Sequence, residues 1–212
     1  MQLKKILFIT LFSIFAIQYT SAQFDGIYSQ YMHIKHFYNP AAIGEQELMK
    51  MMVAQRLDWI GIKNAPKTTL FTVNTPFEIG KTHHAAGIQF VNDIFGVFAN
   101  QQINAQYAYK FKFDYGTLSI GANIGVLNLI CYGDSVKMVE SDYHTENDPA
   151  IPQGTQTGVG FDLSAGVYFS NATWFAGISI LHAPGANIKL GDKYDFQLNQ
   201  AILFLIQHQL HY

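Results

Sequence analysis

The stretch Ile103–Val126 decides the fold, and it reads INAQYAYKFKFDYGTLSIGANIGV. Its residues alternate between two faces with the two-residue period of a β-strand. One face carries apolar and aromatic side chains, namely Ile103, Ala105, Tyr107, Tyr109, Phe111, Phe113, Leu118, Ile120, Ala122, Ile124 and Val126. The other face carries Asn104, Gln106, Ala108, Lys110, Lys112, Ser119, Gly121, Asn123 and Gly125. A short turn at Asp114–Gly116 joins the two halves, so the stretch predicts a long β-hairpin.

The polar face of this hairpin has an unusual composition. An ordinary soluble sheet covers its solvated face with Lys, Glu, Arg and Thr, whereas this face is mostly Asn, Gln, Ser, Gly and Ala. Large apolar groups toward lipid and small polar groups toward a lumen are typical of a membrane β-barrel. The predicted fold class is therefore all-β, an antiparallel outer-membrane β-barrel. A soluble β-sandwich is the alternative.

The first 22 residues have the pattern of a secretory signal peptide. Lys4 and Lys5 precede an apolar run from Ile6 to Ile17, which ends close to Ala22. A membrane-spanning helix needs about 20 apolar residues, so this run is too short to be an anchor. We expect cleavage after Ala22 and export from the cytoplasm.

Composition points to the outer membrane. Charged residues make up 13% of the chain, about half the roughly 25% of soluble proteins, and aromatic residues make up 15%. No later segment has the run of about 18 apolar residues that an α-helical membrane protein needs. The net charge of -2 gives no reason to expect a nucleic-acid partner. The single cysteine, Cys131, cannot form an intramolecular disulfide.

The remainder divides into two regions. Residues 23–50 are aromatic and irregular, and Pro40 interrupts regular structure, so we interpret them as a periplasmic lead-in or plug segment. Residues 51–212 form the predicted barrel domain. Its eight expected strands are 51–61, 68–75, 85–92, 99–113, 117–130, 160–169, 173–182 and 195–206.

The connections between these strands support the barrel. Outer-membrane barrels alternate short periplasmic turns with longer external loops. If the chain starts in the periplasm, the short turns Asp114–Gly116 and Ser170–Ala172 are periplasmic, and the longer connections 131–159 and 183–194 are external. The connection 75–84 fits less well, because it is long for a periplasmic turn.

No metal or cofactor site is predicted. The adjacent His83 and His84 would point to opposite faces of a strand. The acidic loop 134–158 lacks the ligand spacing of a calcium-binding loop. We therefore expect the acidic side chains to be solvated.

No catalytic residue is predicted either. Ser179 and His182 are three positions apart on one strand, which places them on opposite faces. Asp162 faces the expected lumen, as do Lys110 and Lys112, and we interpret these three as an internal salt-bridge network. An outer-membrane enzyme would need a Ser/His/acid cluster, and the sequence shows none.

An ordered series of short motifs is similar to one family of membrane proteins. The motifs are Gln30-Tyr31-Met32, Asn39-Pro40-Ala41 with Gly44, Gln55-Arg56, Trp59-Ile60-Gly61, Ala65-Pro66 with Thr68, Asn92-Asp93 with Gly96, Tyr107-Ala108-Tyr109 and Leu118-Ser119-Ile120-Gly121. Over about residues 24–182 the chain resembles the PorP/SprF family, which is associated with type IX secretion and gliding motility.

The resemblance implies a non-enzymatic outer-membrane barrel that binds the secretion machinery or anchors an exported adhesin. The implied partners are other type IX components in the periplasm and outer membrane, a secreted adhesin and outer-membrane lipid, with no nucleic acid. The alternative is a small porin-like barrel for passive solute passage. The motif residues with an expected structural role are Asn39, Pro40, Arg56, Trp59, Gly61, Pro66, Asp93 and Gly96. We also consider that Arg56 pairs with Asp93 inside the barrel.

The chain is shorter than typical members of that family. Its eight strands either close as a small barrel, which the even number allows, or belong to a truncated product with unpaired edges. An open edge in lipid costs several kcal/mol per unsatisfied backbone group. The length favours truncation.

Overall fold

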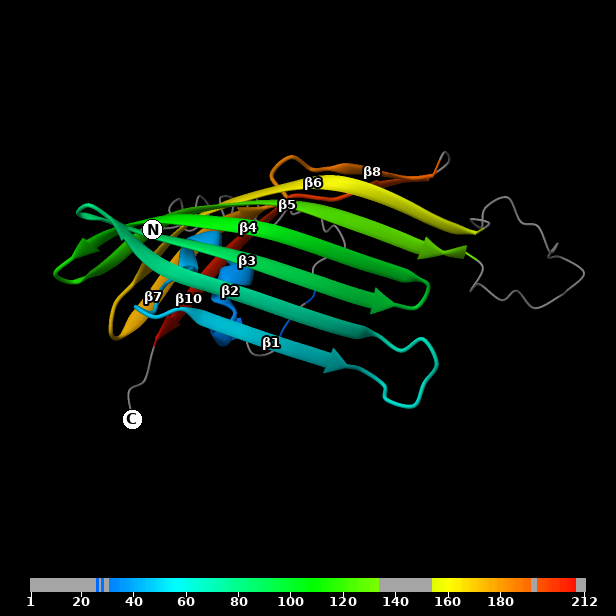
Figure 1. Ribbon diagram of the computed structural model, residues 1–212, viewed down its shortest axis with the longest axis horizontal. Helices are drawn as coiled ribbons and strands as arrows, with labels where there is room; N and C mark the ends of the chain where they lie inside the picture. Colours follow the sequence, from blue (N-terminus) through cyan, green and yellow to red (C-terminus); the bar gives the residue numbers. More distant parts are fainter. Residues whose placement is uncertain (1–25, 27, 29–30, 134–153, 192–193, 209–212) are drawn as a thin grey trace, which may run out of the picture.

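The computed structural model describes residues 26, 28, 31–133, 154–191 and 194–208. The expected signal peptide, residues 1–22, and most of the acidic loop lie outside these residues. The described chain confirms the all-β fold class. One antiparallel sheet has the strand order β1-β2-β3-β4-β5-β6-β7-β10 and curls into a half-barrel (Figure 1). The strands are β1 (Lys50–Leu57), β2 (Lys67–Ile79), β3 (Thr82–Phe95), β4 (Phe98–Phe113), β5 (Gly116–Tyr132), β6 (Thr155–Ser170), β7 (Trp174–Leu181) and β10 (Ala201–His208).

The two faces of the sheet have the predicted chemistry. Ile103 is 57% exposed, whereas its neighbour Asn104 is 1% exposed. The same alternation holds in β6, where Phe161 is exposed and Ser164 is buried. Apolar side chains therefore point outward and polar side chains point into the half-barrel, as expected for strands whose outer face meets lipid.

Short turns gather at one end of the sheet. β4 and β5 are joined through Asp114 and Tyr115, and β6 and β7 through residues 171–173. The connection 75–84, which the sequence suggested was long, is also tight, because only Gly80 and Lys81 separate β2 from β3. We call this end the short-turn end.

The opposite end, the long-loop end, carries the connections 58–66, 133–154 and 182–200, together with a tight turn at Gly96. The predicted alternation of connection lengths is therefore confirmed, apart from that one tight turn.

Pro76 explains why β2 was predicted too short. Proline usually ends a strand, because it has no backbone N–H to donate. Here β1 begins at Lys50, opposite Asn74, and does not reach Pro76. Pro76 therefore pairs with Ala85 of β3 without costing β1 a backbone partner.

The predicted strand 195–206 is wrong, because the chain breaks in its middle. β8 (Asn187–Leu190) and β9 (Tyr194–Gln197) form a separate hairpin, and β10 begins only at Ala201. Leu198 lies at the break, where it is buried and its N–H donates to the carbonyl oxygen of Ala186 at 2.9 Å.

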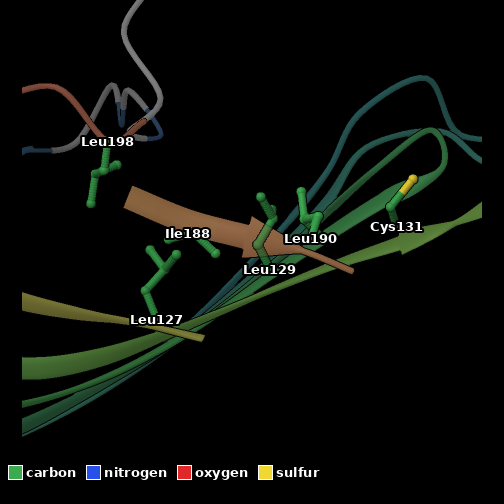
Figure 2. Packing of buried hydrophobic residues seen from close by; sticks show 6 residues of the cluster. All are labelled: Leu127, Leu129, Cys131, Ile188, Leu190 and Leu198. Carbon is green, nitrogen blue, oxygen red and sulfur yellow. The ribbon is translucent and has the colours of Figure 1, made fainter. Parts of the chain in front are cut away.

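The β8–β9 hairpin lies over the inner face of β5 and β6 near the long-loop end. Its Ile188 and Leu190 pack with inward-facing residues of β5, and Figure 2 shows this apolar cluster. The full cluster is Leu127, Leu129, Cys131, Ile188, Leu190 and Leu198. Gly160 permits the close approach, because a Cβ there would lie 2.6 Å from Ile188 Cγ1. The hairpin thus packs on the inner face of β5 and β6 in the long-loop half of the interior.

The half-barrel is open along two edges. Within the described residues, β1 pairs with β2 alone and β10 pairs with β7 alone. The closed eight-stranded barrel that the strand number allowed is therefore not formed.

Candidate functional site

The polar interior of the half-barrel holds the N-terminal segment, which we define as residues 31–47. It contains three single-turn helices: η1 (Tyr31–His33), α2 (Lys35–Tyr38) and η2 (Pro40–Ala42), drawn in blue in Figure 1. No helix among the described residues is long and apolar enough to cross a membrane. η2 lies against β4, β5 and β6, and this part of the segment is buried.

Local sequence explains the sharp turn of η2. Asn39 is its N-cap, and the Asn39 side-chain oxygen accepts a hydrogen bond from the N–H of Ala41 at 3.0 Å. Pro40 follows at the first helical position, where a missing N–H costs nothing. Asn39 and Pro40 therefore start this helix, through the cap hydrogen bond and through the fixed backbone of proline.

The side chain of Asn39 also reaches the barrel wall. Its Nδ2 donates to the carbonyl oxygens of Val167 at 3.0 Å and Ile178 at 3.3 Å. These two residues pair directly between β6 and β7. Gly177 provides the space, because a Cβ there would lie 2.6 Å from Asn39 Nδ2. One side chain thus bonds the N-terminal segment to the junction of two strands.

Side chains of three strands hold the backbone of the segment. Gln106 on β4 donates to the carbonyl of His36 at 3.0 Å, and Ser179 on β7 donates to that of Tyr38 at 2.5 Å. Lys110 Nζ donates to the carbonyl of Gly44 at 2.6 Å. Asn74 on β2 accepts from the N–H of Gly44 at 3.1 Å. Four buried polar side chains of the wall are therefore hydrogen-bonded to the backbone of this segment.

A charged contact closes the same site. Lys35 Nζ lies 2.8 Å from Glu45 Oε2, and the Tyr168 hydroxyl donates to Glu45 Oε1 at 2.9 Å. Lys35 Nζ also lies 4.0 Å from the centroid of the Phe175 ring, within range of a cation–π interaction. The ion pair is thus supported by hydrogen bonding and by an aromatic face.

His36 is buried in the segment, outside the strands. Burial, together with the nearby positive charge of Lys50, lowers the pKa of its imidazole to about 4. His36 is therefore neutral at neutral pH.

The internal salt-bridge network that the sequence suggested is wrong in its partners. The Asp162 carboxylate accepts a hydrogen bond from Gln102 Nε2 at 3.0 Å and lies 2.9 Å from His182 Nδ1. Lys110 bonds Gly44, as described above, and Lys112 lies 3.4 Å from Glu47. Both lysines therefore contact the N-terminal segment, which supplies closer acceptors than the more distant Asp162.

The expected face of His182 is also wrong. β7 ends at Leu181, and His182 has a φ of +54°, so the strand alternation stops and its side chain turns inward. Ser179 and His182 are both buried inside the half-barrel. The Ser179 hydroxyl nevertheless donates to Tyr38.

A second group of motif residues lies at the long-loop end of β1, β2 and β3. Arg56 forms its salt bridge with Asp58 at 2.9 Å, and Asp93 accepts a hydrogen bond from Thr68 at 2.5 Å. Arg56 and Asp93 each pair with Thr68 across the sheet, so Thr68 stands between them. In place of the expected direct pair, Arg56 and Asp93 lie on either side of Thr68.

The other motif residues shape the connections at this end. Trp59 is 70% exposed with a φ of +49°, and Gly61 has a φ of +100°. The carbonyl of Pro66 accepts a hydrogen bond from the N–H of Asp58 at 3.1 Å, which closes the β1–β2 loop. Gly96 has a φ of +60° in the tight β3–β4 turn. The positive φ angles at Gly61 and Gly96 are backbone conformations that favour glycine.

Metal binding has no geometric support in the described part of the chain. No group of three or more His, Cys, Asp or Glu side chains there is placed to hold an ion. His83 faces inward and lies 2.8 Å from Glu78, whereas His84 stacks on Phe77 of the outer face. The predicted divergence of the two histidines is confirmed.

The glycines of the polar face are what sequence reasoning missed. Gly121, Gly166 and Gly177 lie close together on β5, β6 and β7. A Cβ on Gly121 would lie 2.6 Å from the backbone nitrogen of Ala41. Three inward-facing glycines on neighbouring strands are the signal that another piece of backbone packs there.

Comparison with protein families agrees with this architecture. Residues 20–211 match the family described as type IX secretion system membrane protein PorP/SprF. The chain belongs to the PorP/SprF family. The match extends beyond the motifs quoted from the sequence and includes β10. No curated protein and no solved structure matches the chain.

Membership in PorP/SprF makes this a membrane protein of the type IX secretion system, and it implies association with other components of that system. The outward apolar face of the half-barrel is consistent with a membrane setting.

Proposed function

We propose that this PorP/SprF protein is a non-enzymatic outer-membrane component that binds another part of the type IX machinery or anchors an exported adhesin. The observation that carries the proposal is the filled interior. Inside the half-barrel, the N-terminal segment packs against β4, β5 and β6, and the β8–β9 hairpin packs against β5 and β6 nearer the long-loop end. A porin instead keeps an aqueous channel through the barrel. The filled interior therefore favours binding over passive solute passage.

The proposal includes an orientation and a domain division. The short-turn end faces the periplasm, in line with the turn lengths of outer-membrane barrels. Residues 1–22 direct export, residues 23–50 act as the plug, and residues 51–212 form the barrel wall. The plug enters from the periplasmic side, where secretion components are accessible to it. A role in gliding motility is part of the same proposal.

The buried dyad of Asp162 and His182 supports a non-enzymatic role. Both side chains are buried, at 1% and 5% exposure, so a substrate does not reach them. Ser179 is committed to the carbonyl of Tyr38. Ser179 thus serves packing of the N-terminal segment.

Co-purification and conductance together test the proposed function. The full chain, tagged at a position outside the strands, is purified from membranes of a type IX-competent bacterium and then reconstituted into liposomes. We expect type IX components to co-purify and the liposomes to conduct no solute. Solute flux without any bound secretion component would overturn the proposal in favour of the porin.

A variant makes the conductance assay informative. Lys110→Met removes the donor that holds the carbonyl of Gly44 and so loosens the plug. Lys67→Met, at an exposed end of β2, is the matched control. Conductance that appears in Lys110→Met and not in Lys67→Met indicates that the N-terminal segment closes the interior.

A further inference from the structure

The β1–β2 loop, residues 58–66, presents large apolar side chains to its surroundings at the long-loop end. Trp59 is 70% exposed, Ile60 is 84% exposed and Ile62 is 64% exposed. A single exposed apolar side chain is ordinary on a protein surface, but three within four positions of one loop form a patch that water disfavours. We call these three side chains the apolar tip. The apolar tip needs an environment other than water.

The backbone of the loop points the apolar tip away from the sheet. The N–H of Ile62 donates to the carbonyl of Trp59 at 3.1 Å, and the N–H of Ala65 donates to the carbonyl of Ile62 at 3.4 Å. Ala65 is buried, so this small residue, and not the larger ones, faces the rest of the protein. Trp59 has a φ of +49°, which is unfavourable for a bulky residue. The loop therefore holds its apolar tip outward at a conformational cost.

The register of the sheet shows where the loop lies relative to the apolar outer face. One outward row across β1 to β5 is apolar throughout, and it consists of Val53, Phe71, Phe90, Ile103 and Val126. The next outward row toward the long-loop end is polar throughout, and it consists of Gln55, Thr69, Asn92, Gln101 and Asn128. From Ile103 to Phe113 the outward residues of β4 are apolar or aromatic, and this stretch has the roughly 9–11 residues that a tilted strand needs to cross a bilayer. The polar row therefore marks the edge of the hydrocarbon layer, and the loop lies just beyond it.

The region just beyond the hydrocarbon layer is the lipid interface, and the loop has the chemistry that suits it. Tryptophan is enriched at membrane–water interfaces, because its ring is apolar while its N–H forms hydrogen bonds. Lys63 and Lys67 are both exposed and bring positive charge to the level of the lipid phosphates. The negative charge of Asp58 is paired with Arg56 at 2.9 Å. Apolar side chains beside positive charge are complementary to lipid headgroups and the first carbons of the acyl chains.

We propose that the β1–β2 loop is a lipid anchor, in which Trp59, Ile60 and Ile62 insert into the interface of the membrane. The surface that covers the apolar tip is therefore lipid. Continuity supports this assignment, because Leu57 extends the outward apolar side chains of β1 from Val53 toward the loop. The anchor fixes the depth of β1 and β2 in the membrane. It goes beyond the binding of secretion components, because it needs no partner protein.

Tryptophan fluorescence tests the insertion directly, because the chain has only 2 tryptophans. Trp174→Phe leaves Trp59 as the single reporter, and the full chain is reconstituted into vesicles of phosphatidylcholine and phosphatidylglycerol. One set of vesicles has acyl chains brominated close to the headgroup, and the other has them brominated near the chain end. We expect the first set to quench Trp59 several-fold more than the second, and iodide on both sides of the membrane to quench it weakly. Strong quenching by iodide, with none by either brominated lipid, overturns the proposal and assigns the apolar tip to a partner protein.

Two charge variants in the single-tryptophan background are matched to each other. Ile60→Asp places a negative charge on the apolar tip, whereas Asn64→Asp adds the same charge at an exposed position of the loop that is already polar. Asn64 has a φ of +60°, which aspartate also tolerates. Quenching of Trp59 by lipid brominated close to the headgroup is expected to fall several-fold in Ile60→Asp and to change little in Asn64→Asp. Equal quenching in the two variants overturns the insertion of the apolar tip.

Trp174 reports whether the barrel itself stays in the membrane. It lies on the outer face at the start of β7, at the short-turn end, and Trp59→Phe leaves it as the single reporter. Its quenching by brominated lipid is expected to be the same with and without Ile60→Asp. The vesicles contain no secretion component. Loss of Trp59 quenching in the native loop while Trp174 is still quenched therefore overturns the lipid anchor alone, and the proposed binding role is judged separately by co-purification.

Discussion

The side-chain amide of Asn39 donates to the carbonyl oxygen of Val167 at 3.0 Å, across 128 positions of sequence. The same nitrogen reaches Ile178, the residue paired with Val167 on the next strand. The N-terminal segment is therefore tied to the register of β6 and β7. Undocking the segment would break this bond together with those of Gln106, Ser179 and Lys110.

Replacing Asn39 should destabilise the folded protein. Asn39→Ala removes the N-cap, worth about 0.5–2 kcal/mol, and two further hydrogen bonds of about 1 kcal/mol each. We expect the free energy of unfolding to fall by about 2.5–4 kcal/mol in urea titrations of the reconstituted protein. Asn39→Asp keeps the cap acceptor and loses the donor, so it should be destabilising too. Losses no larger than that of Gln55→Ala, on the exposed outer face, would contradict the role of Asn39.

Gly121→Ala should push the N-terminal segment away from β5. The added Cβ would lie 2.6 Å from the backbone nitrogen of Ala41, and overpacking of this kind costs about 1–3 kcal/mol. Limited trypsin digestion, with cleavage after Lys35 or Lys50 as the readout, should be faster than in the native protein. Ala122→Val, one residue away on the outer face, is the control. An unchanged digestion rate in Gly121→Ala would show that the segment does not rest on this glycine.

Acidification should weaken the folded state through His36. The pKa of His36 is about 4 in the folded protein and about 6.5 in the unfolded chain. Below pH 6.5 the unfolded chain therefore binds a proton that the folded protein does not bind. The contribution of His36 is thus complete above pH 6.5, falls as the pH drops toward 4, and then levels off. The total loss is about 3 kcal/mol.

His36→Gln isolates that contribution. The variant should show a shallower decline of unfolding free energy than the native protein between pH 6.5 and 4, and the two curves should run parallel above pH 7. Parallel curves over the whole range would mean that His36 has the same pKa in the folded and the unfolded protein. Lys50, whose charge also lowers the pKa, is retained in both proteins.

Ile188→Ala should release the β8–β9 hairpin from the inner face. Ile188 is fully buried against the inner face of β5 and β6, and truncating such a side chain costs about 2–5 kcal/mol. Hydrogen exchange of the amides in 187–197 should speed up while the amides of β4 and β5 stay protected. Leu163→Ala, on the exposed outer face, is the control. Equal exchange rates in the two variants would mean that Ile188 does not hold the hairpin on the inner face.

Much of the wall was predictable, because strand alternation is a local signal. The hairpin of β4 and β5 and the faces of β6 and β7 follow from a two-residue period within each segment. The errors arose where strand pairing or burial outweighed the local preference of a residue for strand structure. The strand predicted over 68–75 stops just before Pro76, but β2 continues through this proline, because β1 does not extend far enough to need its missing N–H. The stretch 195–206 has strand-like composition, yet Leu198 breaks it to reach the buried cluster.

The interior was less predictable, because its contacts join distant parts of the chain. Lys110 was expected to meet Asp162 on the basis of charge, and instead it bonds the carbonyl of Gly44. Every residue has a backbone carbonyl, so no sequence motif predicts which one accepts this hydrogen bond. The resemblance singled out Asn39, Pro40 and Gly96 as structural positions, but it carried no information on their contacts.

The sequence by itself determined the all-β class, the apolar outer face and the family, since each of these is written in local periodicity or in short ordered motifs. The tertiary structure alone decided that the eight strands stay open, that a backbone segment fills their interior, and that Lys110 and Asn39 hold it there. The physical reason is that burial and edge pairing depend on which distant segments compete for the same space and the same backbone groups.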